Sequence, residues 1–343
     1  MGPVARVALD AMGSDLGPAA TVAGAAAVTT GPNAPTITLV GDEAAIRAEL
    51  AKVEHDPARV RVVHTAGVCP MGASPKEALD ATPDASVLVA ARLVAAGEAD
   101  VLVSAGNTGA VTLACARTFA RLPGVSRAAL GAVLPTERLR GEKKDPFTLL
   151  LDAGLTLDPT ADDLVAFAVM GVAYAQRISR NPRPTVALLS NGAEPGKGTI
   201  AVVEAHRRLS QRADLDFIGN VEGMDLPRGT ADVVVTGGFV GNIVLKMIEG
   251  MAETAARTIR ATGERRWRYA AGLALLAPAL RRMKRATDWQ QYGGVPVLGF
   301  DRLCIKAHGR STSRAIANAL KIATKTARSD LVGGIRAALT AAP

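Results

Sequence analysis

Four short glycine-rich loops carry the side chains in this chain that could do chemistry. Each loop follows an apolar run and precedes a helix-like one: SAGNTGA (104–110), SNGAEPGKG (190–198), TGGFVGN (236–242) and AHGRST (307–312). Glycine lets the backbone approach a bulky ligand, and a helix N-terminus offers unpaired N–H groups with a partial positive charge. A single loop of this kind is equally compatible with a plain tight turn. Because four such loops occur in one chain, we predict an anion site.

The runs before these loops indicate which elements hold them. They are VLV (101–103), TVALL (185–189), DVVV (232–235) and LCIK (303–306), which lack polar alternation, as expected of parallel strands buried on both faces. In an open α/β sheet the ligand crevice lies at the carboxyl ends of the strands, so we expect the four loops to meet at one edge. Further strands (36–42, 59–65, 131–136, 148–154) alternate with helices (18–29, 85–100, 108–121, 161–178), which predicts a doubly wound sheet with right-handed crossovers.

Composition limits the classes of partner. Only 3% of the 343 residues are aromatic, so the core is expected to consist of Ala, Val, Leu and Ile, and Trp and Tyr are too few for a stacking surface. The net charge of +8 favours an anionic partner: nucleic acid, an acidic protein, a phosphorylated substrate or an anionic membrane. The N-terminus lacks a signal-peptide layout and no stretch approaches the ~18 apolar residues of a membrane span, which predicts a soluble cytoplasmic chain.

Several catalytic signatures are absent. GAEPGKGT (192–199) has three residues between Gly192 and Gly196 where the Walker A motif has four, and no G-x-G-x-x-G or G-x-S-x-G stands in the sequence. Three isolated cysteines (Cys69, Cys115 and Cys304) predict neither a disulfide nor a metal set. Lys197 is then either a phosphate-binding point charge or a solvated loop cation. Asn107 and Asn242 could each cap a helix or donate to a substrate oxygen, and for either alone the cap is favoured.

One segment interrupts the α/β pattern. A long helix is expected over 241–263, and after it eleven mostly apolar residues (270–280) lie between two basic clusters, with Trp267 and Tyr269 beside the first. This layout suits a helix at a lipid surface. It is equally compatible with a helix packed on its partner with a solvated charged rim.

Eight collinear motifs resemble one family across nearly the whole chain. They are DAMGSDLGP (10–18), LVGD (39–42), GEADVLVSAGNTGA (97–110), LLDAG (150–154), FIGNVEG (217–223), GGFVGNIVLK (237–246), YGGVPVLG (292–299) and AHG (307–309). In this order they resemble the PlsX-type phosphate acyltransferases. The resemblance implies a homodimeric three-layer α/β/α fold with a mostly parallel sheet, related to isocitrate dehydrogenase and phosphotransacetylase. It also implies transfer of a fatty acyl group from acyl carrier protein to inorganic phosphate, which gives acyl phosphate for phospholipid synthesis.

The same resemblance implies a set of site residues. The lysine of the family's E-x-x-K-G motif matches Lys197, and the asparagine of its G-F-V-G-N motif matches Asn242. We therefore expect both residues to be catalytic, with Lys197 binding phosphate and Asn242 polarising the thioester carbonyl. Substrate binding is expected at Asp10, Gly13, Asn107, Thr108, Gly109, Gly238, Gly241, His308 and Gly309. No metal, cofactor or nucleic acid is implied.

The resemblance also implies how the chain is organised and where it acts. It implies a single domain over 1–343 with a protruding helical hairpin at 247–285 for dimer and membrane contact. We expect this hairpin to hold the chain at the inner face of the cell membrane, on an anionic surface, through Trp267, Leu273, Leu275, Leu276, Arg281 and Arg282.

The chain also departs from the family pattern. Asp80 and Thr82 replace an arginine and a lysine, Gly237 replaces an aspartate, Ser14 replaces a glycine, and the stretches 154–156 and 190–194 differ from the family's own. Two alternatives therefore stay open at this point. One is a diverged relative that keeps the fold, with ligand or membrane binding, without the reaction. The other is a phosphotransacetylase-like enzyme that uses coenzyme A.

Overall fold

The computed structural model describes residues 4–31, 33–140, 145–287 and 293–341, with the backbone alone at 139–140, 145–146 and 281–287. Its core is an eleven-stranded sheet in the order β3-β2-β1-β4-β11-β10-β5-β6-β9-β7-β8. In that order the strands are Val60–His64, Thr36–Gly41, Arg6–Asp10, Val101–Ser104, Leu303–Lys306, Val295–Leu298, Ala129–Arg140, Asp145–Leu151, Val233–Val235, Thr185–Leu189 and Asp216–Val221. Seven of the ten pairings between these strands are parallel.

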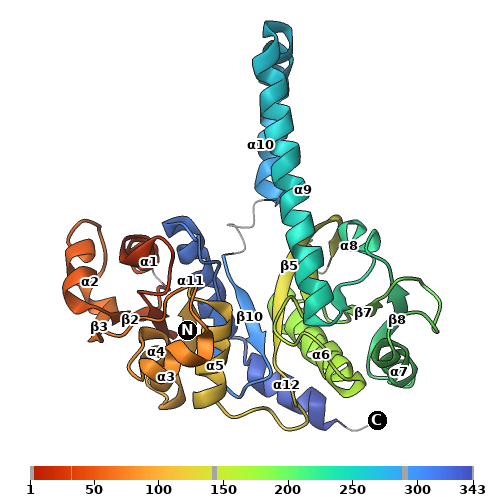
Figure 1. Ribbon diagram of the computed structural model, residues 1–343, viewed down its shortest axis with the longest axis horizontal. Coiled ribbons are helices and arrows are strands. Elements are labelled where there is room, and N and C mark those ends of the chain that lie inside the picture. Colours follow the sequence, from red (N-terminus) through yellow and green to blue (C-terminus); the bar gives the residue numbers. More distant parts are fainter. Residues whose placement is uncertain (1–3, 32, 141–144, 288–292, 342–343) are drawn as a thin grey trace.

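Helices cover both faces of this sheet (Figure 1). They are α1 (Gly17–Ala26), α2 (Glu43–Leu50), α3 (Pro75–Ala81), α4 (Ser86–Ala95), α5 (Thr108–Thr118), α6 (Ala161–Tyr174), α7 (Ile200–Leu209), α8 (Asp225–Arg228), α9 (Gly238–Arg265), α10 (Trp267–Thr287), α11 (Ser313–Ala327) and α12 (Leu331–Thr340). The predicted three-layer α/β/α class with a mostly parallel sheet is confirmed.

The expectation that all four glycine loops share one edge of the sheet is wrong. Three antiparallel pairings, β11 with β10, β10 with β5, and β5 with β6, lie in the middle of the sheet. They reverse the strand direction, so β4 and β11 run one way while β9 and β7 run the other. The reversal was missed because β5 and β6 read as two ordinary strands of a doubly wound sheet. Below, β3, β2, β1, β4 and β11 are the first strand set, and β6, β9, β7 and β8 are the second.

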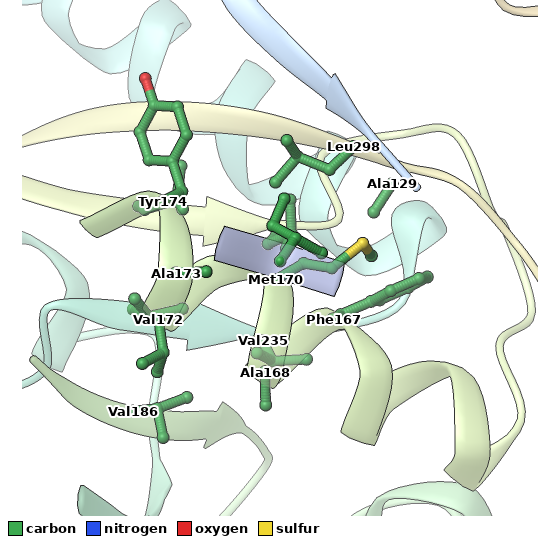
Figure 2. Close-up of a cluster of buried hydrophobic side chains, with 14 of the residues drawn as sticks. Ala129, Phe167, Ala168, Met170, Val172, Ala173, Tyr174, Val186, Val235 and Leu298 are labelled. Atoms are coloured by element: carbon green, nitrogen blue, oxygen red, sulfur yellow. The ribbon is translucent and has the colours of Figure 1, made fainter. Parts of the chain in front are cut away.

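The core of the second strand set is built around α6. Thr160 and Asp163 form a capping box at its start, in which the Thr160 hydroxyl accepts from the Asp163 N–H and the Asp163 carboxylate accepts from the Thr160 N–H. Eleven of the fourteen residues of α6 are buried. Phe167 and Met170 pack with Leu298 and Val235 in the cluster that Figure 2 shows. Burial of side chains of this size contributes about 1.5–3 kcal/mol each, so this contact fixes α6 on the sheet.

Helices α9 and α10 form a hairpin that protrudes from the sheet (Figure 1). The chain reverses at Arg266, whose backbone is extended, and Leu273 packs at the turn within 2.7 Å of the place a Cβ on Gly263 would take. Trp267 (76%) and Leu275 (84%) are the most exposed large apolar side chains of α10 whose burial is described. Among the described residues, none of the helices combines the length and apolar character needed to span a bilayer.

Candidate functional site

Asp10 organises the loops at the end of the first strand set. Its carboxylate accepts hydrogen bonds from Ser86 Oγ (2.6 Å) and Ser104 Oγ (2.7 Å), and from the N–H groups of Met12 (3.2 Å) and Gly13 (3.1 Å). The side chain is 1% exposed. Because these donors come from three separate segments, Asp10 ties the end of β1 to α4 and β4. The geometry gives Asp10 a positioning role, with its lone pairs already engaged.

Glycines at this edge are required by close approach of one loop to another. A Cβ on Gly13 would contact the Asp10 carboxylate and would lie 2.9 Å from Gly106 Cα. A Cβ on Gly309 would lie 2.6 Å from the Asp15 carboxylate, and one on Gly109 would lie 2.6 Å from Pro75. No side chain fits at these three places without movement of the backbone or its neighbours.

Asn107 is the cap of α5. Its Oδ1 accepts from the Ala110 N–H (3.1 Å) and its Nδ2 donates to the Met71 carbonyl (2.7 Å), so both ends of the amide are engaged in the fold. Thr108 follows as the first residue of α5 and is partly exposed.

His308 and Lys306 lie on the strand and loop that follow. Burial lowers the pKa of Lys306 to about 8, against the opposing attraction of Cys304, Asp10 and Asp15. Burial also lowers the pKa of His308; Glu249 opposes this shift, and Lys306, Arg310 and Lys246 add to it. Since Lys246 and Glu249 belong to α9, the His308 loop lies within electrostatic reach of that helix.

Asp152 anchors the start of α9 on the other strand set. Its carboxylate accepts from the N–H groups of Leu130 (2.8 Å), Gly154 (3.1 Å), Leu155 (3.0 Å) and Thr156. Burial raises its pKa, and these four backbone donors partly offset the rise. The start of α9 also packs closely against Asp152 itself. A Cβ on Gly238 would lie 2.7 Å from Asp152 Oδ2, and one on Gly241 would collide with the Asp152 carbonyl oxygen.

Asn242 and Lys197 have free side chains, unlike Asn107. Asn242 lies in the second turn of α9, is exposed, and packs beside Gly154, and its amide has no hydrogen-bond partner in the described part of the chain. Gly237 is the N-cap residue of α9 and supplies no side-chain acceptor, and among the N–H groups of the first turn that of Gly238 donates to the Thr156 carbonyl (2.8 Å). Lys197 is exposed, and its aliphatic stem covers Gly192 in the loop after β7.

A cavity of about 580 Å³ lies between the Lys197 loop and the start of α9. Its walls are mostly apolar and include Leu157, Pro159, Leu189, Val202, Phe239 and Val240. Ser190, Asn191, Thr199 and Thr236 add polar atoms. A volume of this size falls in the range of small-molecule sites.

The predicted residues thus fall into two groups. Asp10, Gly13, Asn107, Thr108, Gly109, His308 and Gly309 lie on the first strand set, while Lys197, Gly238, Gly241 and Asn242 lie on the second. Lys246 and Glu249 of α9 both influence the pKa of His308, Lys246 lowering it and Glu249 raising it. Sequence reasoning did not single out Asp152, which anchors the start of α9, or Lys246. Both stand inside motifs already noted, LLDAG and GGFVGNIVLK, and the position of Asp152 directly after an apolar strand was the available signal.

Two departures from the family pattern have a structural consequence. Asp80 pairs with Lys76 (2.9 Å) and with Arg117 (2.5 Å), and the hydrogen bonds from these two side chains, first from Lys76, lower its pKa. Asp80 is therefore ion-paired with two cationic side chains, Lys76 and Arg117, beside α5. Gly237 removes a carboxylate from the N-cap of α9, which makes that helix end more attractive to an anion.

The three cysteines are buried thiols, and burial raises the pKa of Cys115 well above its ordinary value. Within the described ranges, no cluster of three or more His, Cys, Asp or Glu side chains is arranged to hold a metal ion.

Comparison with known proteins gives consistent results. Residues 5–333 match the model of a family described as "Fatty acid synthesis protein". A protein named phosphate acyltransferase from Myxococcus xanthus is 44% identical over 98% of this chain and 92% of its own length. One of the same name from Brevibacillus brevis is 40% identical over 95% of both. Among solved structures, a phosphotransacetylase from Streptococcus pyogenes superimposes with a TM-score of 0.64 at 17% identity over 95% of each chain, which is a likeness of fold.

Proposed function

The chain belongs to the phosphate acyltransferase family, and on that premise we propose that it transfers a fatty acyl group from acyl carrier protein to inorganic phosphate. Full-length identity of 44% with a named phosphate acyltransferase is the observation that carries the proposal. The chain is thus an acyltransferase of phospholipid synthesis.

The reaction needs an anion site beside a thioester site. A phosphate oxygen attacks the thioester carbonyl carbon, a C–O bond forms, the C–S bond breaks, and the carrier thiolate leaves and takes up a proton. An enzyme accelerates this step by holding the two reactants at ~3–3.5 Å and by stabilising the oxyanion that develops on the carbonyl oxygen. We assign the anion site to the first turn of α9, where Gly237 brings no capping side chain, together with the exposed Lys197.

Within this site we assign Lys197 to phosphate and Asn242 to the thioester carbonyl. The support is that both side chains are free and exposed, whereas Asn107 is engaged at both ends of its amide. Lys246 stands one helical turn beyond Asn242 on the same side of α9, so it adds positive charge where the phosphate would sit. Asp152 positions the start of α9, while Asp10 positions the loops of the first strand set.

The apolar cavity beside Phe239 and Val240 suits the acyl chain. It lies between the Lys197 loop and the first turn of α9, and we assign the thioester end of the chain to Asn242 in the next turn of that helix. Burial of methylene groups in such a cavity contributes about 0.8 kcal/mol each, which favours long acyl chains.

Helix α9 also carries an unpartnered apolar stripe, which we assign to a homodimer. Phe239 (59%), Ile243 (49%), Met247 (63%) and Met251 (67%) are exposed at helical spacing. The tip of the hairpin, with Trp267, Leu275 and Leu276 exposed, is assigned to an anionic membrane surface. Leu273 packs against α9 instead, so its contribution is to the hairpin itself. The side chains of Arg281 and Arg282 lie outside the described part of the chain.

Comparison of two acyl donors tests the donor assignment. Palmitoyl carrier protein and palmitoyl coenzyme A are supplied at equal concentration with phosphate, and release of free thiol is followed. The proposal predicts the higher kcat/KM with carrier protein, whose acidic surface complements the net charge of +8. A higher kcat/KM with palmitoyl coenzyme A would show that coenzyme A is the acyl donor. Turnover of neither donor would show that the chain keeps the fold but does not catalyse this reaction.

A further inference from the structure

A second large cavity, of about 840 Å³, lies away from the proposed reaction site. It is bounded by residues 27–31 and 33–35, by the last turns of α11, and by the π-helical continuation of α6 (Ala175–Ser179) with Arg180. It shares no lining residue with the cavity between the Lys197 loop and α9, so this cavity, here called the basic groove, is separate from the proposed reaction site.

The charged residues that line the basic groove are all positive. Five of its lining residues are cationic and none is acidic: Arg177, Arg180, Lys321, Lys325 and Arg328. Lys321, Lys325 and Arg328 recur at spacings of four and three along α11, which places them on one face of that helix. Among the described residues, no carboxylate lies within 4.0 Å of Arg177, Arg180, Lys321 or Arg328.

Two of the cations also join the walls of the groove. Lys325 Nζ donates to the Ile178 carbonyl (2.5 Å), and Arg328 Nη2 donates to the Asn33 carbonyl (3.2 Å). These bonds tie α11 both to the end of α6 and to the segment before β2. The groove therefore spans the two strand sets, because α6 packs on the second while α1 and α11 pack side by side on the first (Figure 1).

The backbone around the groove is unusual. A π-helical turn at Ala175–Ser179 forms one wall, and such turns are frequent at functional sites. Arg180 follows it with φ +56°, and Asp330, next to the lining residue Ser329, has φ +49°. These are the two non-glycine residues of positive φ in the described part of the chain. A positive φ costs energy for a residue with a side chain, and it is retained where neighbouring structure enforces it.

From this geometry we propose that the basic groove binds a small organic polyphosphate, the chemical class of a nucleoside triphosphate. Several phosphate groups would neutralise Arg177, Arg180 and Lys321. Ala27, Val28, Ala34 and Pro35 offer an apolar wall to the organic part. The volume lies in the range of small-molecule sites. A ligand held here contacts the end of α6 and the end of α11, which pack on different strand sets.

Isothermal titration calorimetry with ATP and with inorganic tripolyphosphate tests this site on the full chain. One ATP should bind per chain, more tightly than tripolyphosphate, and more weakly as salt is raised. Lys321→Glu and Arg177→Glu should each weaken ATP binding by about tenfold or more. The control Arg228→Glu makes the same change in net charge at an exposed arginine outside the groove and should stay within about twofold.

Thermal unfolding gives a second readout, because a ligand that binds only the folded chain raises its Tm. ATP should raise the Tm of the parent, of Arg228→Glu and of Lys197→Ala, but not that of the two groove variants. Three results would each overturn the proposal: equal weakening in Arg228→Glu, loss of ATP binding in Lys197→Ala, or groove variants that keep ATP binding and raise the KM for acyl carrier protein. The last would assign the groove to the carrier protein.

Discussion

Asn242 packs directly over Gly154: the Asn242 Cβ lies 3.2 Å from the position that a Cβ on Gly154 would occupy. Gly154 has φ +133°, a conformation that side chains rarely adopt, and its N–H donates to Asp152. The loop after β6 therefore fixes both the start of α9 and the place of the Asn242 amide.

Gly154→Ala should displace Asn242 and lower kcat, while the KM for phosphate changes little. It should also destabilise the fold by more than about 1 kcal/mol, because alanine is strained at positive φ. Steady-state kinetics and urea unfolding measure the two effects. Gly31→Ala is the matched control, since Gly31 has open space around its Cα and its φ is not positive. Equal kinetics in the two variants would contradict the role of Gly154.

Lys197→Ala and Asn242→Ala should fail differently. Loss of the Lys197 charge should raise the KM for phosphate, with any added fall in kcat marking contacts made in the transition state. Loss of the Asn242 amide should lower kcat by about 10²–10³, the usual scale for one oxyanion donor. Initial rates over a range of phosphate concentrations separate the two effects. Folded variants with parental kinetics would remove both residues from the site.

Lys306 predicts a specific pH dependence of stability. Its folded pKa of about 8 lies below the ordinary 10.5, so between these values the unfolded chain binds more protons. The free energy of unfolding should therefore rise with pH over this window, by on the order of 3 kcal/mol for this group. Below about pH 8 the charged lysine is buried and this contribution is absent. Lys306→Met should lack the rise, as urea unfolding from pH 7.5 to 10.5 would show. Parallel curves for the two proteins would contradict a depressed pKa.

The hairpin tip should bind anionic vesicles reversibly. Leu275→Glu and Leu276→Glu place charge at exposed apolar positions and should reduce co-sedimentation with phosphatidylglycerol vesicles at low salt. Ile218→Glu on β8 adds the same charge at an exposed apolar residue of the sheet and should pellet like the parent. If all four proteins pellet equally, or the parent does not pellet, the tip makes no membrane contact.

Much of the fold followed from local pattern. Apolar runs without polar alternation located β4, β7, β9 and β11, and the acidic start of 161–178 located α6, whose capping residue Thr160 and inner carboxylate Asp163 are visible in the sequence. The central antiparallel strands were not predictable in this way. Strand direction depends on which strands pair across the sheet, and Val295–Leu298 carries no local signal that it pairs antiparallel to both β11 and β5.

The candidate site was predicted less completely. Glycine spacing located the loops, and the family resemblance singled out Lys197 and Asn242. Whether an asparagine caps a helix or is free depends on tertiary contacts: Met71 engages the amide of Asn107, while the loop at Gly154 leaves that of Asn242 exposed. The influence of Lys246 on the pKa of His308 likewise depends on where the fold places α9, which no local pattern encodes.

Phosphate-dependent formation of acyl phosphate is the reaction that defines a phosphate acyltransferase, and it can be measured directly. The purified chain is incubated with palmitoyl carrier protein, with and without inorganic phosphate, and the product is trapped with hydroxylamine and quantified against released thiol. We expect one palmitoyl hydroxamate per thiol, only when phosphate is present, and a loss of about 10²–10³ in rate for Asn242→Ala. Thiol release that is independent of phosphate, or no trapped product while a relative of the same family is active in parallel, would contradict it.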